Sequence, residues 1–404
     1  LKRVYLKETN PVPFYYLNRS SSILIPFASA NDGILIQEQP NPIVLNNIKE
    51  KLNQLPDFIC LNKGENETND FVFDLSEASE ILEKLSTYQI APWGWSDRVF
   101  RLSESKFKKS CSSNSSKVTK TVNSKVFSHE CRFNLLPVSF QVPSVLILDN
   151  KMNTSELLNT LTSFQKQQSG IYVKNFFGTA GKLSSKHSSS NFSNRKLKTW
   201  NRWIRDKQGI LLEKAYNVKK EFSLQIDIEQ TGHVLPIAVT EMYNSQSGSY
   251  IGNILSEDHS DLLHKLMETF NDVFKSIADQ GYSGPVGFDL METDGNELKL
   301  IEINARLNMG RVAVEWHKLM GSASYGFFAN LFLEARNLKT CENTCNLLKE
   351  LAEIYNCTST LINYIQPEGR PTILITIYIG ANRKVDIFKL LNQLKPSVLQ
   401  RDIV

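Results

Sequence analysis

The 404-residue sequence has no run of 18 or more apolar residues and only six cysteines. The first absence excludes a membrane-spanning helix, and the second excludes a disulfide-stabilised scaffold. The segment LKRVYLKETNPVPFYY has no long apolar core, so we do not expect a secretory signal there, and we expect a cytoplasmic protein. The net charge of +4 permits anionic substrates but is too small to indicate nucleic acid, and we expect neither nucleic acid nor membrane as a partner.

Several common chemical motifs are also missing. The segment from Gly178 to Lys182 (GTAGK) has two residues too few between its glycines for a Walker phosphate loop, and Leu183 follows its lysine. No strand is followed by G-x-G-x-x-G, and there is no H-E-x-x-H or G-x-S-x-G. The six histidines are not at zinc spacing. These absences exclude the commonest nucleotide-binding loops, zinc proteases and serine hydrolases.

Residues 1 to about 100 alternate short apolar runs with amphipathic stretches. The runs SSILIPFA, GILIQ and DFICL are typical of strands, and PIVLNNIKEKLNQL and SEASEILEKLSTY are typical of helices. This alternation indicates an α/β layer with a largely parallel sheet. In APWGWSDRV two tryptophans flank Gly94, and we interpret this segment either as a packed corner beneath a turn or as an aromatic wall that faces a ligand.

The composition then changes. Residues 103–125 are rich in Ser and Lys and are expected to form a surface loop or linker, and residues 183–193 resemble them. The part from about 140 to 335 is better patterned. Its strands are SVLILD, GIYVKNF and GILLEKAY, followed by a hairpin over EFSLQIDIEQTGHVLPIAVTEMY. Helices are expected at TSELLNTLTSFQKQ and over 262–277, and the segment after 335 adds the helix NLLKELAEIY and the strand PTILITIYIG.

The most informative stretch is GPVGFDLMETDGNELKLIEINARLNMGR. It is typical of two strands joined at the turn pair Asp294-Gly295. With Thr293 opposite Leu298, Asp289 lies opposite Glu302, and Asn304 is two residues further along the same face. Two facing carboxylates in an apolar setting repel each other unless a cation compensates, and Mg²⁺ prefers such oxygen ligands. The alternative is a strand pair with exposed carboxylates.

Two further segments would complete a nucleotide site. Lys174 ends an apolar strand and enters a small-residue loop at Gly178, whose backbone N–H groups could approach phosphate. Glu213, in LLEKAY, stands where a strand runs into a bend and could accept a hydrogen bond from an adenine amino group. Taken alone, the lysine strand and its loop are a weak signal, and a surface strand end is the better explanation of the Glu213 segment.

Along the chain, the lysine strand with its loop, the Glu213 segment and the carboxylate hairpin follow one another. Together and in this order they resemble the ATP-grasp superfamily of Mg-ATP-dependent ligases, over about residues 120–335. The resemblance implies α/β and α+β architecture. Residues 141–335 would form an ATP-grasp fold, in which two α+β subdomains sandwich ATP. A Rossmann-like N-terminal α/β domain over 1–140 would precede it, and a small α+β extension over 336–404 would follow it.

The resemblance also assigns site residues. Those assigned to Mg²⁺ or Mn²⁺ are Asp289, Glu302 and Asn304. Arg306 would contact the acyl phosphate or the transition state. Gly287 stands where some D-alanine-ligase-like members carry Arg, which argues against that dipeptide chemistry unless Arg311 substitutes; the candidate catalytic residues are therefore Lys174, Arg306 and Arg311. The nucleotide contacts implied by the lysine strand, glycine loop and hinge are Lys174, Gly178, Thr179, Ala180, Gly181, Glu213, Lys214, Ala215, Tyr216 and Glu221. Among them, Glu213 would meet the adenine amino group, the 214–216 backbone the ring, and Glu221 the ribose. The family also has a further lysine upstream of the first helix, for which Lys125 in VNSKVFSHE is the candidate.

The implied activity is a ligase reaction. ATP would activate a carboxylate as an acyl phosphate, which an amine would attack, with release of ADP and phosphate; the partners are a small-molecule carboxylate and an amine. A kinase-like phosphotransferase on the same fold and a non-catalytic nucleotide-binding module are the alternatives. Substrate specificity is expected in the segments 183–196 and 243–252, and homo-oligomerisation stays open.

Overall fold

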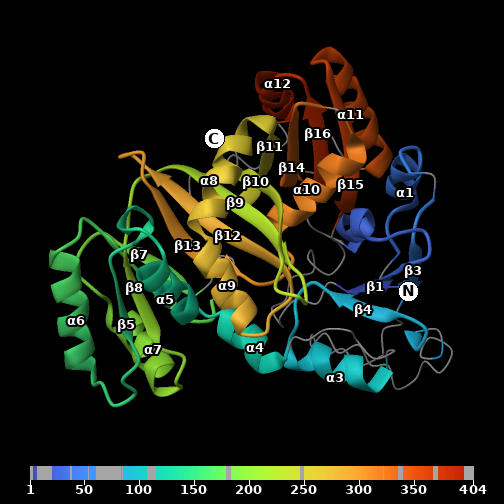
Figure 1. Ribbon diagram of the computed structural model, residues 1–404. Helices are drawn as coiled ribbons and strands as arrows, with labels where there is room; N and C mark the ends of the chain where they lie inside the picture. Colours follow the sequence, from blue (N-terminus) through green and yellow to red (C-terminus); the bar gives the residue numbers. More distant parts are fainter. Residues whose placement is uncertain are drawn as a thin grey trace. The chain divides into compact units, whose positions relative to one another are not determined.

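The computed structural model describes residues 3–6, 21–36, 39–52, 54–60, 83, 85–106, 115–178, 183–245, 250–321, 323–334, 340–366 and 372–394. The chain divides into two compact units, and Figure 1 labels the helices and strands named below. Unit 1 comprises Leu1–Ser116, Ala238–Asp261 and Arg306–Val404, and unit 2 comprises Lys117–Ile237 and Leu262–Ala305. Among the described helices, none has the length and apolarity that crossing a bilayer requires.

Unit 1 begins with a four-stranded parallel sheet in the order β3-β2-β1-β4. Its strands are β1 (Arg3–Leu6), β2 (Gly33–Ile36), β3 (Asp57–Cys60) and β4 (Gln89–Pro92), and its helices are α1 (Pro42–Lys49) and α3 (Asp97–Lys106). The predicted α/β layer with a parallel sheet is confirmed. The run SSILIPFA is not a strand, however; it contains the 3-10 helix η1 (Ser21–Phe27). Ile23, Leu24 and Ile25 are all buried, which the alternating faces of a strand would not allow on a one-sided core.

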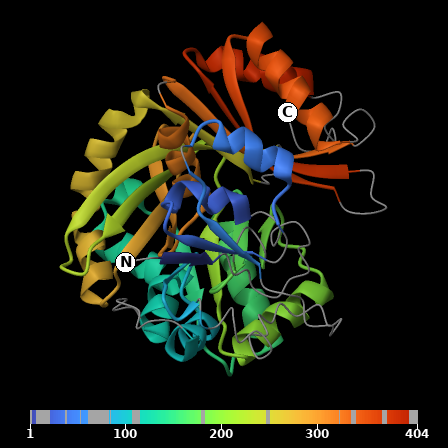
Figure 2. The ribbon, with the colours of Figure 1, turned by 90° about the vertical axis from the view of Figure 1, so that its right-hand side faces the viewer.

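The rest of unit 1 is an antiparallel sheet with helices. In this unit the strand order is β10-β11-β14-β16-β15. The elements are β10 (Val234–Asn244, which begins in unit 2), β11 (Tyr250–Ser256), η3 (Glu257–His259), α10 (Met309–Met320), β14 (Tyr325–Glu334), α11 (Cys341–Ile354), β15 (Cys357–Ile365), β16 (Thr372–Ala381) and α12 (Lys384–Leu394). Figure 2 shows the N-terminal segment (blue) beside the C-terminal one (red). The two are joined where α1 packs on β15, and Asn47 Nδ2 donates to Cys345 Sγ at 3.0 Å.

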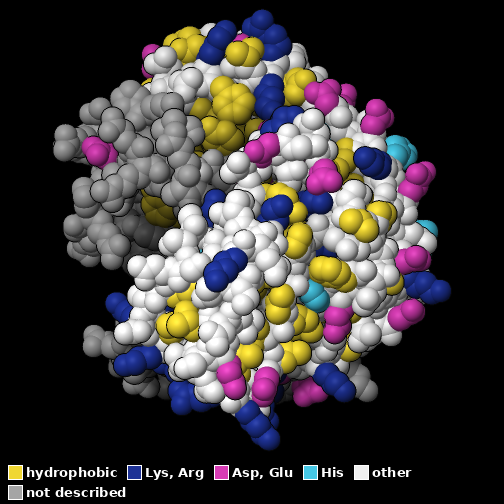
Figure 3. Space-filling model, turned by 90° about the vertical axis from the view of Figure 1, so that its left-hand side faces the viewer, with side chains coloured by type: hydrophobic (Ala, Val, Ile, Leu, Met, Phe, Trp, Pro, Cys, Tyr) yellow, Lys and Arg dark blue, Asp and Glu magenta, His cyan; other side chains and the backbone are white. Residues whose placement is uncertain are grey.

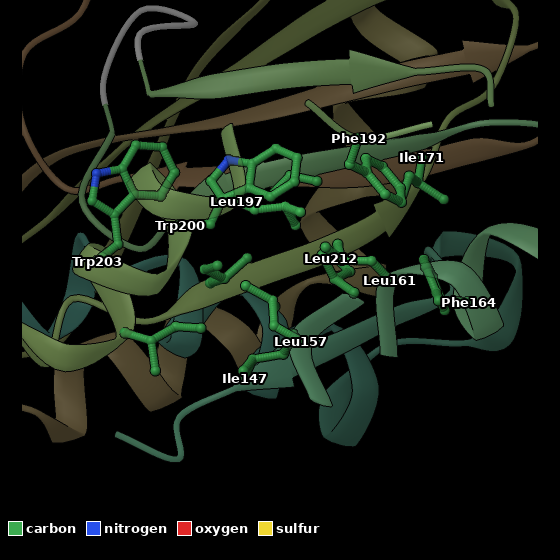
Figure 4. Packing of buried hydrophobic residues seen from close by; sticks show 13 residues of the cluster. Ile147, Leu157, Leu161, Phe164, Ile171, Phe192, Leu197, Trp200, Trp203 and Leu212 are labelled. Carbon is green, nitrogen blue, oxygen red and sulfur yellow. The ribbon is translucent and has the colours of Figure 1, made fainter. Parts of the chain in front are cut away.

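Unit 2 contains an antiparallel four-stranded sheet in the order β5-β8-β6-β7, covered by two helices. The elements are β5 (Ser144–Ile147), α6 (Thr154–Lys166), β6 (Ile171–Asn175), β7 (Ser184–His187), α7 (Asn194–Arg205) and β8 (Ile210–Lys214). Figure 4 shows Leu157 and Leu161 from α6 and Leu197 and Trp200 from α7 gathered with Leu212 of β8. Because strand residues alternate, this core takes one face of the sheet and leaves the other face to the polar residues between.

A three-stranded antiparallel part of unit 2 follows the order β13-β12-β9. Its elements are α4 (Ser116–Val122), α5 (Lys125–Leu135), η2 (Val138–Phe140), β9 (Val218–Ile228), α8 (Ser260–Thr269), α9 (Asn271–Asp279), β12 (Gly284–Thr293) and β13 (Leu298–Asn304). Phe288 of β12 packs edge-on against Phe270 and Phe274. The helices therefore bury one face of these strands, and residues one position away, such as Asp289, lie on the other face.

Three predicted segments differ from the structure. The 103–125 segment is helical in its described part, at the end of α3 and over α4, with residues 107–114 outside the described residues. Within 183–193 the chain forms β7, paired with β6, and His187 packs against Phe192 and Trp200. The predicted helix over 262–277 is two helices that meet at the fully buried Phe270.

Other predictions are left untested. The predicted helix SEASEILEKLSTY lies almost wholly outside the described residues. The predicted domain boundaries after residues 140 and 335 stay a prediction.

On the face drawn in Figure 3, basic and acidic side chains are interspersed, which is typical of a solvated protein surface with a small net charge.

Candidate nucleotide and metal site

The β12–β13 hairpin brings Asp289 and Glu302 directly opposite each other, as predicted. The pairing on the turn side is shifted by one residue, because Glu292 pairs with Leu298 and Thr293 N–H donates to the carbonyl of Glu297 at 3.0 Å. A bulge between Asp289 and the next residue takes up this shift. The predicted pairing of Thr293 with Leu298 is therefore wrong, whereas the pairing at the carboxylates is correct.

Each carboxylate oxygen of Asp289 accepts a hydrogen bond from a side chain. Ser223 Oγ donates to Oδ1 at 2.9 Å, and Asn304 Nδ2 donates to Oδ2 at 2.9 Å. Gln225 Nε2 in turn donates to Ser223 Oγ at 2.8 Å. Ser223 and Gln225 alternate along β9 and face Asp289 and Gly287 in the register, so the polar face extends over three strands.

Glu302 is paired with Lys125, at the first residue of α5. Lys125 Nζ lies 2.7 Å from Glu302 Oε1 and donates to the carbonyl of Gly178 at 2.7 Å. The Lys125 side chain is 8% exposed and that of Glu302 is 23% exposed. Ser124 caps α5 by accepting from Phe127 N–H, which fixes the direction in which the lysine leaves the helix.

The helix α5 is attached along β13 by side chains that meet the backbone. Asn123 Oδ1 accepts from Ala305 N–H at 2.9 Å, and Ser128 Oγ accepts from Ile303 N–H at 3.1 Å. These bonds fix the position of Lys125 relative to Glu302.

The second ionic group centres on Glu213 of β8. Lys174 Nζ lies 2.5 Å from its Oε2, and Arg132 NH2 lies 2.6 Å from its Oε1. Burial alone would raise the pKa of the Glu213 carboxyl, but Lys174 and Arg132 beside it lower that pKa to about 2. Ser144 and Tyr172 flank Glu213 in the strand register. All these side chains lie on the face of the sheet opposite the hydrophobic core.

The predicted hinge residues are partly engaged within the protein. Lys214 N–H donates to the carbonyl of Pro143 and Ala215 N–H to that of Gly170, at 2.9 and 2.8 Å. Lys214 Nζ lies over the Tyr216 ring, 4.6 Å from its centroid. The structure thus brings Lys125 and Glu302 together, and Lys174 and Glu213 together.

Two further predictions concern Glu221 and the glycine loop. Glu221 lies on β9 opposite Met291, on the same face as Ser223. Of the glycine loop only Gly178 is described; Thr179, Ala180 and Gly181 lie outside the described residues.

Arg306 and Arg311 belong to unit 1. Arg306 NH1 donates to the carbonyl of Leu307 at 3.3 Å, and a Cβ built on Gly94 would lie 3.2 Å from the Arg306 Cβ. Leu307 N–H donates to the carbonyl of Trp93 at 2.9 Å, so the tryptophan corner packs on this segment. Arg311 Nε donates to Glu315 at 2.8 Å, one turn further along α10. The tryptophan corner thus packs against a candidate catalytic residue, and Trp93, Gly94 and Trp95 are half-buried.

The donor set at Asp289 fits a hard divalent cation. Two carboxylates and an amide oxygen are oxygen ligands of the kind that Mg²⁺ takes together with phosphate oxygens. The ammonium group of Lys125 at Glu302 is a positive charge next to this set. Among the described residues no group of three or more His, Cys, Asp or Glu side chains could hold a metal ion, so Asp289 and Glu302 would need a further oxygen ligand, such as the Asn304 amide or a phosphate.

Sequence reasoning missed Arg132, Ser223 and Gln225. Arg132 follows Lys125 by seven residues and therefore lies on the same face of α5, so the helical period could have indicated that both side chains point to the same site. Ser223 and Gln225 follow Glu221 at intervals of two, the period of one strand face. All three side chains are buried.

Residues 135–310 match the model of a family described as ATP-grasp domain. By sequence, the chain matches no curated protein. Solved structures with a similar fold include an N5-carboxyaminoimidazole ribonucleotide synthetase in an ADP complex, with 12% identity, a TM-score of 0.58, and coverage of 98% of this chain and 96% of that chain. A biotin carboxylase from Campylobacter jejuni in a β-γ-ATP complex has 11% identity, a TM-score of 0.57, and coverage of 98% and 91%.

A third similar structure is the biotin carboxylase domain of the Hydrogenobacter thermophilus 2-oxoglutarate carboxylase. It has 14% identity, a TM-score of 0.56, and coverage of 98% of this chain and 90% of that chain, and it was solved with MgADP, ADP and bicarbonate. At such identities the likeness shows the fold, and the predicted ATP-grasp fold is confirmed. The predicted ATP and Mg²⁺ agree with the nucleotides and the magnesium that these structures hold.

Proposed function

Because residues 135–310 match the model of an ATP-grasp domain, we propose that this protein is a Mg-ATP-dependent ligase. It activates a carboxylate as an acyl phosphate and couples it to an amine, and ADP and phosphate are released. One observation carries the proposal: Asp289, Glu302 and Asn304 share one face of unit 2, with Lys125 directly on Glu302.

In this proposal the nucleotide binds to the polar face of the four-stranded sheet in unit 2. Lys174 and Lys125 exchange their carboxylate partners for phosphate oxygens, and the backbone of the Gly178–Gly181 loop donates to the same phosphates. Glu213 accepts from the adenine amino group, Tyr216 lies at the ring, and Glu221 accepts from the ribose. The N–H groups of Lys214 and Ala215 already donate within the protein, so recognition of the ring by this segment relies on its carbonyls and on Tyr216.

The metal ligands in this proposal are Asp289, Glu302 and Asn304. Bound Mg²⁺ would supply charge neutralisation between the nucleotide phosphates. Ser223 supports the set by donating to Asp289 Oδ1, which orients the carboxylate. Lys125 leaves Glu302 when a phosphate takes the ammonium group.

The chemical logic follows from the poor reactivity of carboxylates. An oxygen of the substrate carboxylate attacks the γ-phosphorus, and the bond to the ADP oxygen breaks. The amine then attacks the carbonyl carbon, and phosphate departs with the bonding electron pair. Arg306, two residues after Asn304, stabilises the negative charge on the transferred group or the oxyanion. Arg311 is a candidate for binding the substrate carboxylate.

A trapping experiment tests the proposal. The full chain is incubated with ATP, Mg²⁺, hydroxylamine and a panel of carboxylates, which includes amino acids, short peptides and bicarbonate because one similar structure was solved with that anion. Hydroxamate formed in step with ADP supports the ligase. A phosphorylated acceptor without hydroxamate would instead indicate a phosphotransferase. Nucleotide binding without turnover over the whole panel would indicate a binding module.

A further inference from the structure

Arg132 is a buried cation for which the proposed reaction has no role so far. Its side chain is 1% exposed, and it reaches three partners on separate strands of unit 2. NH2 lies 2.6 Å from Glu213 Oε1 and 3.3 Å from Ser144 Oγ, and NH1 donates to the carbonyl of Leu300 at 2.9 Å. Its Nε has no hydrogen-bond partner among the described residues. Burying a guanidinium costs free energy unless the charge is paired and hydrogen-bonded.

The charge of Arg132 is paired with the buried carboxylate of Glu213. The carboxylate is 3% exposed, and its two oxygens are divided between Lys174 and Arg132. In the proposed function Lys174 moves to a phosphate of the nucleotide. Glu213 would then be a buried carboxylate without a cation if Lys174 were its sole partner, and it would take up a proton or resist the move.

We propose that Arg132 is a positioning residue of the nucleotide site, which keeps Glu213 charged and in place when Lys174 transfers to the phosphates. With Oε1 fixed by the guanidinium, Oε2 becomes available to the adenine amino group as Lys174 leaves it. Lys174 alone could not both pair with Glu213 and bind the phosphates, and Arg132 provides the pairing with Glu213 while Lys174 binds the phosphates. The inference rests on the proposed nucleotide site.

Other charged and titratable groups lie near Glu213 and contribute to the pH dependence of nucleotide binding. They are Arg132 and His129 from α5 and Lys174 and Tyr172 from β6. Burial lowers the pKa of His129, with Arg132 adding to the effect. Because Arg132 lowers this pKa and Glu213 raises it, the cycle below is carried out with His129→Gln in every protein, which removes the titration of the imidazole.

The test is a double-mutant cycle on Mg-ADP affinity, measured by calorimetry between pH 6 and 8. Arg132→Met should weaken binding by about 10- to 100-fold at pH 8, within the range of coupling between contacting residues. The loss should shrink as the pH falls, because a proton on Glu213 replaces the missing guanidinium. Glu213→Gln in the Arg132→Met background should remove this extra pH dependence and restore affinity to within about fivefold of Glu213→Gln alone.

Two control variants separate charge from packing. Arg132→Lys keeps the charge and should retain most of the affinity. Arg205→Met makes the same substitution at an exposed position at the end of α7 and should change the affinity by less than about twofold. The melting temperature of each variant shows whether it is folded.

Additive losses in Arg132→Met and Glu213→Gln, or an Arg132→Met loss that does not vary with pH, would overturn the positioning role. If Arg132→Met does not fold, the double variant decides: affinity well below that of Glu213→Gln alone, with an unchanged pH profile, overturns it too. Failure of the wild type to bind Mg-ADP would overturn the proposed function itself, and this inference with it.

Discussion

Lys125 Nζ and Glu302 Oε1, 177 residues apart in the sequence, form an ion pair of 2.7 Å. The lysine is the first residue of α5, and the glutamate is one of the proposed metal ligands on β13. The ammonium group and a divalent cation therefore compete for one carboxylate. The competition ends when a nucleotide phosphate takes the lysine, so metal and nucleotide should assist each other's binding.

Lys125→Met removes this competition. Without nucleotide, the variant should unfold about 1–3 kcal/mol more easily, because a half-buried carboxylate loses its partner. Mg²⁺ alone should then raise its melting temperature more than it raises that of the wild type, since Glu302 is available to the metal. Affinity for Mg-ADP should nevertheless fall, because a phosphate contact is lost.

The matched control is Lys219→Met. Lys219 pairs with Glu292 on the same hairpin at 3.1 Å, but its side chain is 52% exposed. This variant should respond to Mg²⁺ as the wild type does. An identical Mg²⁺ response in Lys125→Met and the wild type would argue against Glu302 as a metal ligand.

Asp289→Asn should abolish turnover and keep the fold. The amide has the shape of the carboxylate but not its charge, and losing such a contact costs at least about 10²-fold in rate. Asp294→Asn, on the exposed turn of the same hairpin, changes charge equally and should leave turnover unchanged. ADP release in the assay that reveals wild-type turnover compares the two. Near-wild-type turnover in Asp289→Asn would remove Asp289 from the metal site.

The hairpin illustrates what the sequence could predict. Counting from the turn places Asp289 opposite Glu302, and the structure agrees. The agreement depends on two deviations that cancel, because the pairing near the turn is one residue shorter and the bulge restores the count. The left-handed residue of the turn is Asn296, with φ of 56°, rather than Gly295. Alternation of apolar residues predicts strands and faces well, but it does not predict bulges.

The alternation of apolar residues could not predict the two ion pairs of the site. The lysines were assigned to phosphates, and nothing in the pattern indicates that Lys125 meets Glu302 or that Lys174 meets Glu213. Those contacts depend on how α5 crosses β13 and on the non-core face of the four-stranded sheet, which are tertiary features. The strand β7 was missed for a similar reason, since Ser-rich segments favour loops until a neighbouring strand pairs with them.

Glu213 should give the protein a specific acid sensitivity. Its folded-state pKa, about 2, lies below the ordinary value of 4.5, so the group stabilises the fold above the ordinary value. This contribution is lost as the pH falls from about 4.5 through 2. Urea unfolding at pH 7, 5, 4 and 3 should show a smaller loss of stability in Glu213→Gln than in the wild type. Parallel losses in both proteins would mean that Glu213 is not held ionised by its partners.

The most direct test of the account is the affinity of the wild-type protein for ADP, measured by calorimetry with excess Mg²⁺ and again in EDTA. The proposed site holds the nucleotide phosphates and the metal together through Asp289, Glu302 and Asn304, with Lys125 released from Glu302. Mg²⁺ should therefore tighten ADP binding by about 5- to 150-fold, and ADP should tighten Mg²⁺ binding by the same factor. Equal ADP affinity in Mg²⁺ and in EDTA would contradict the account.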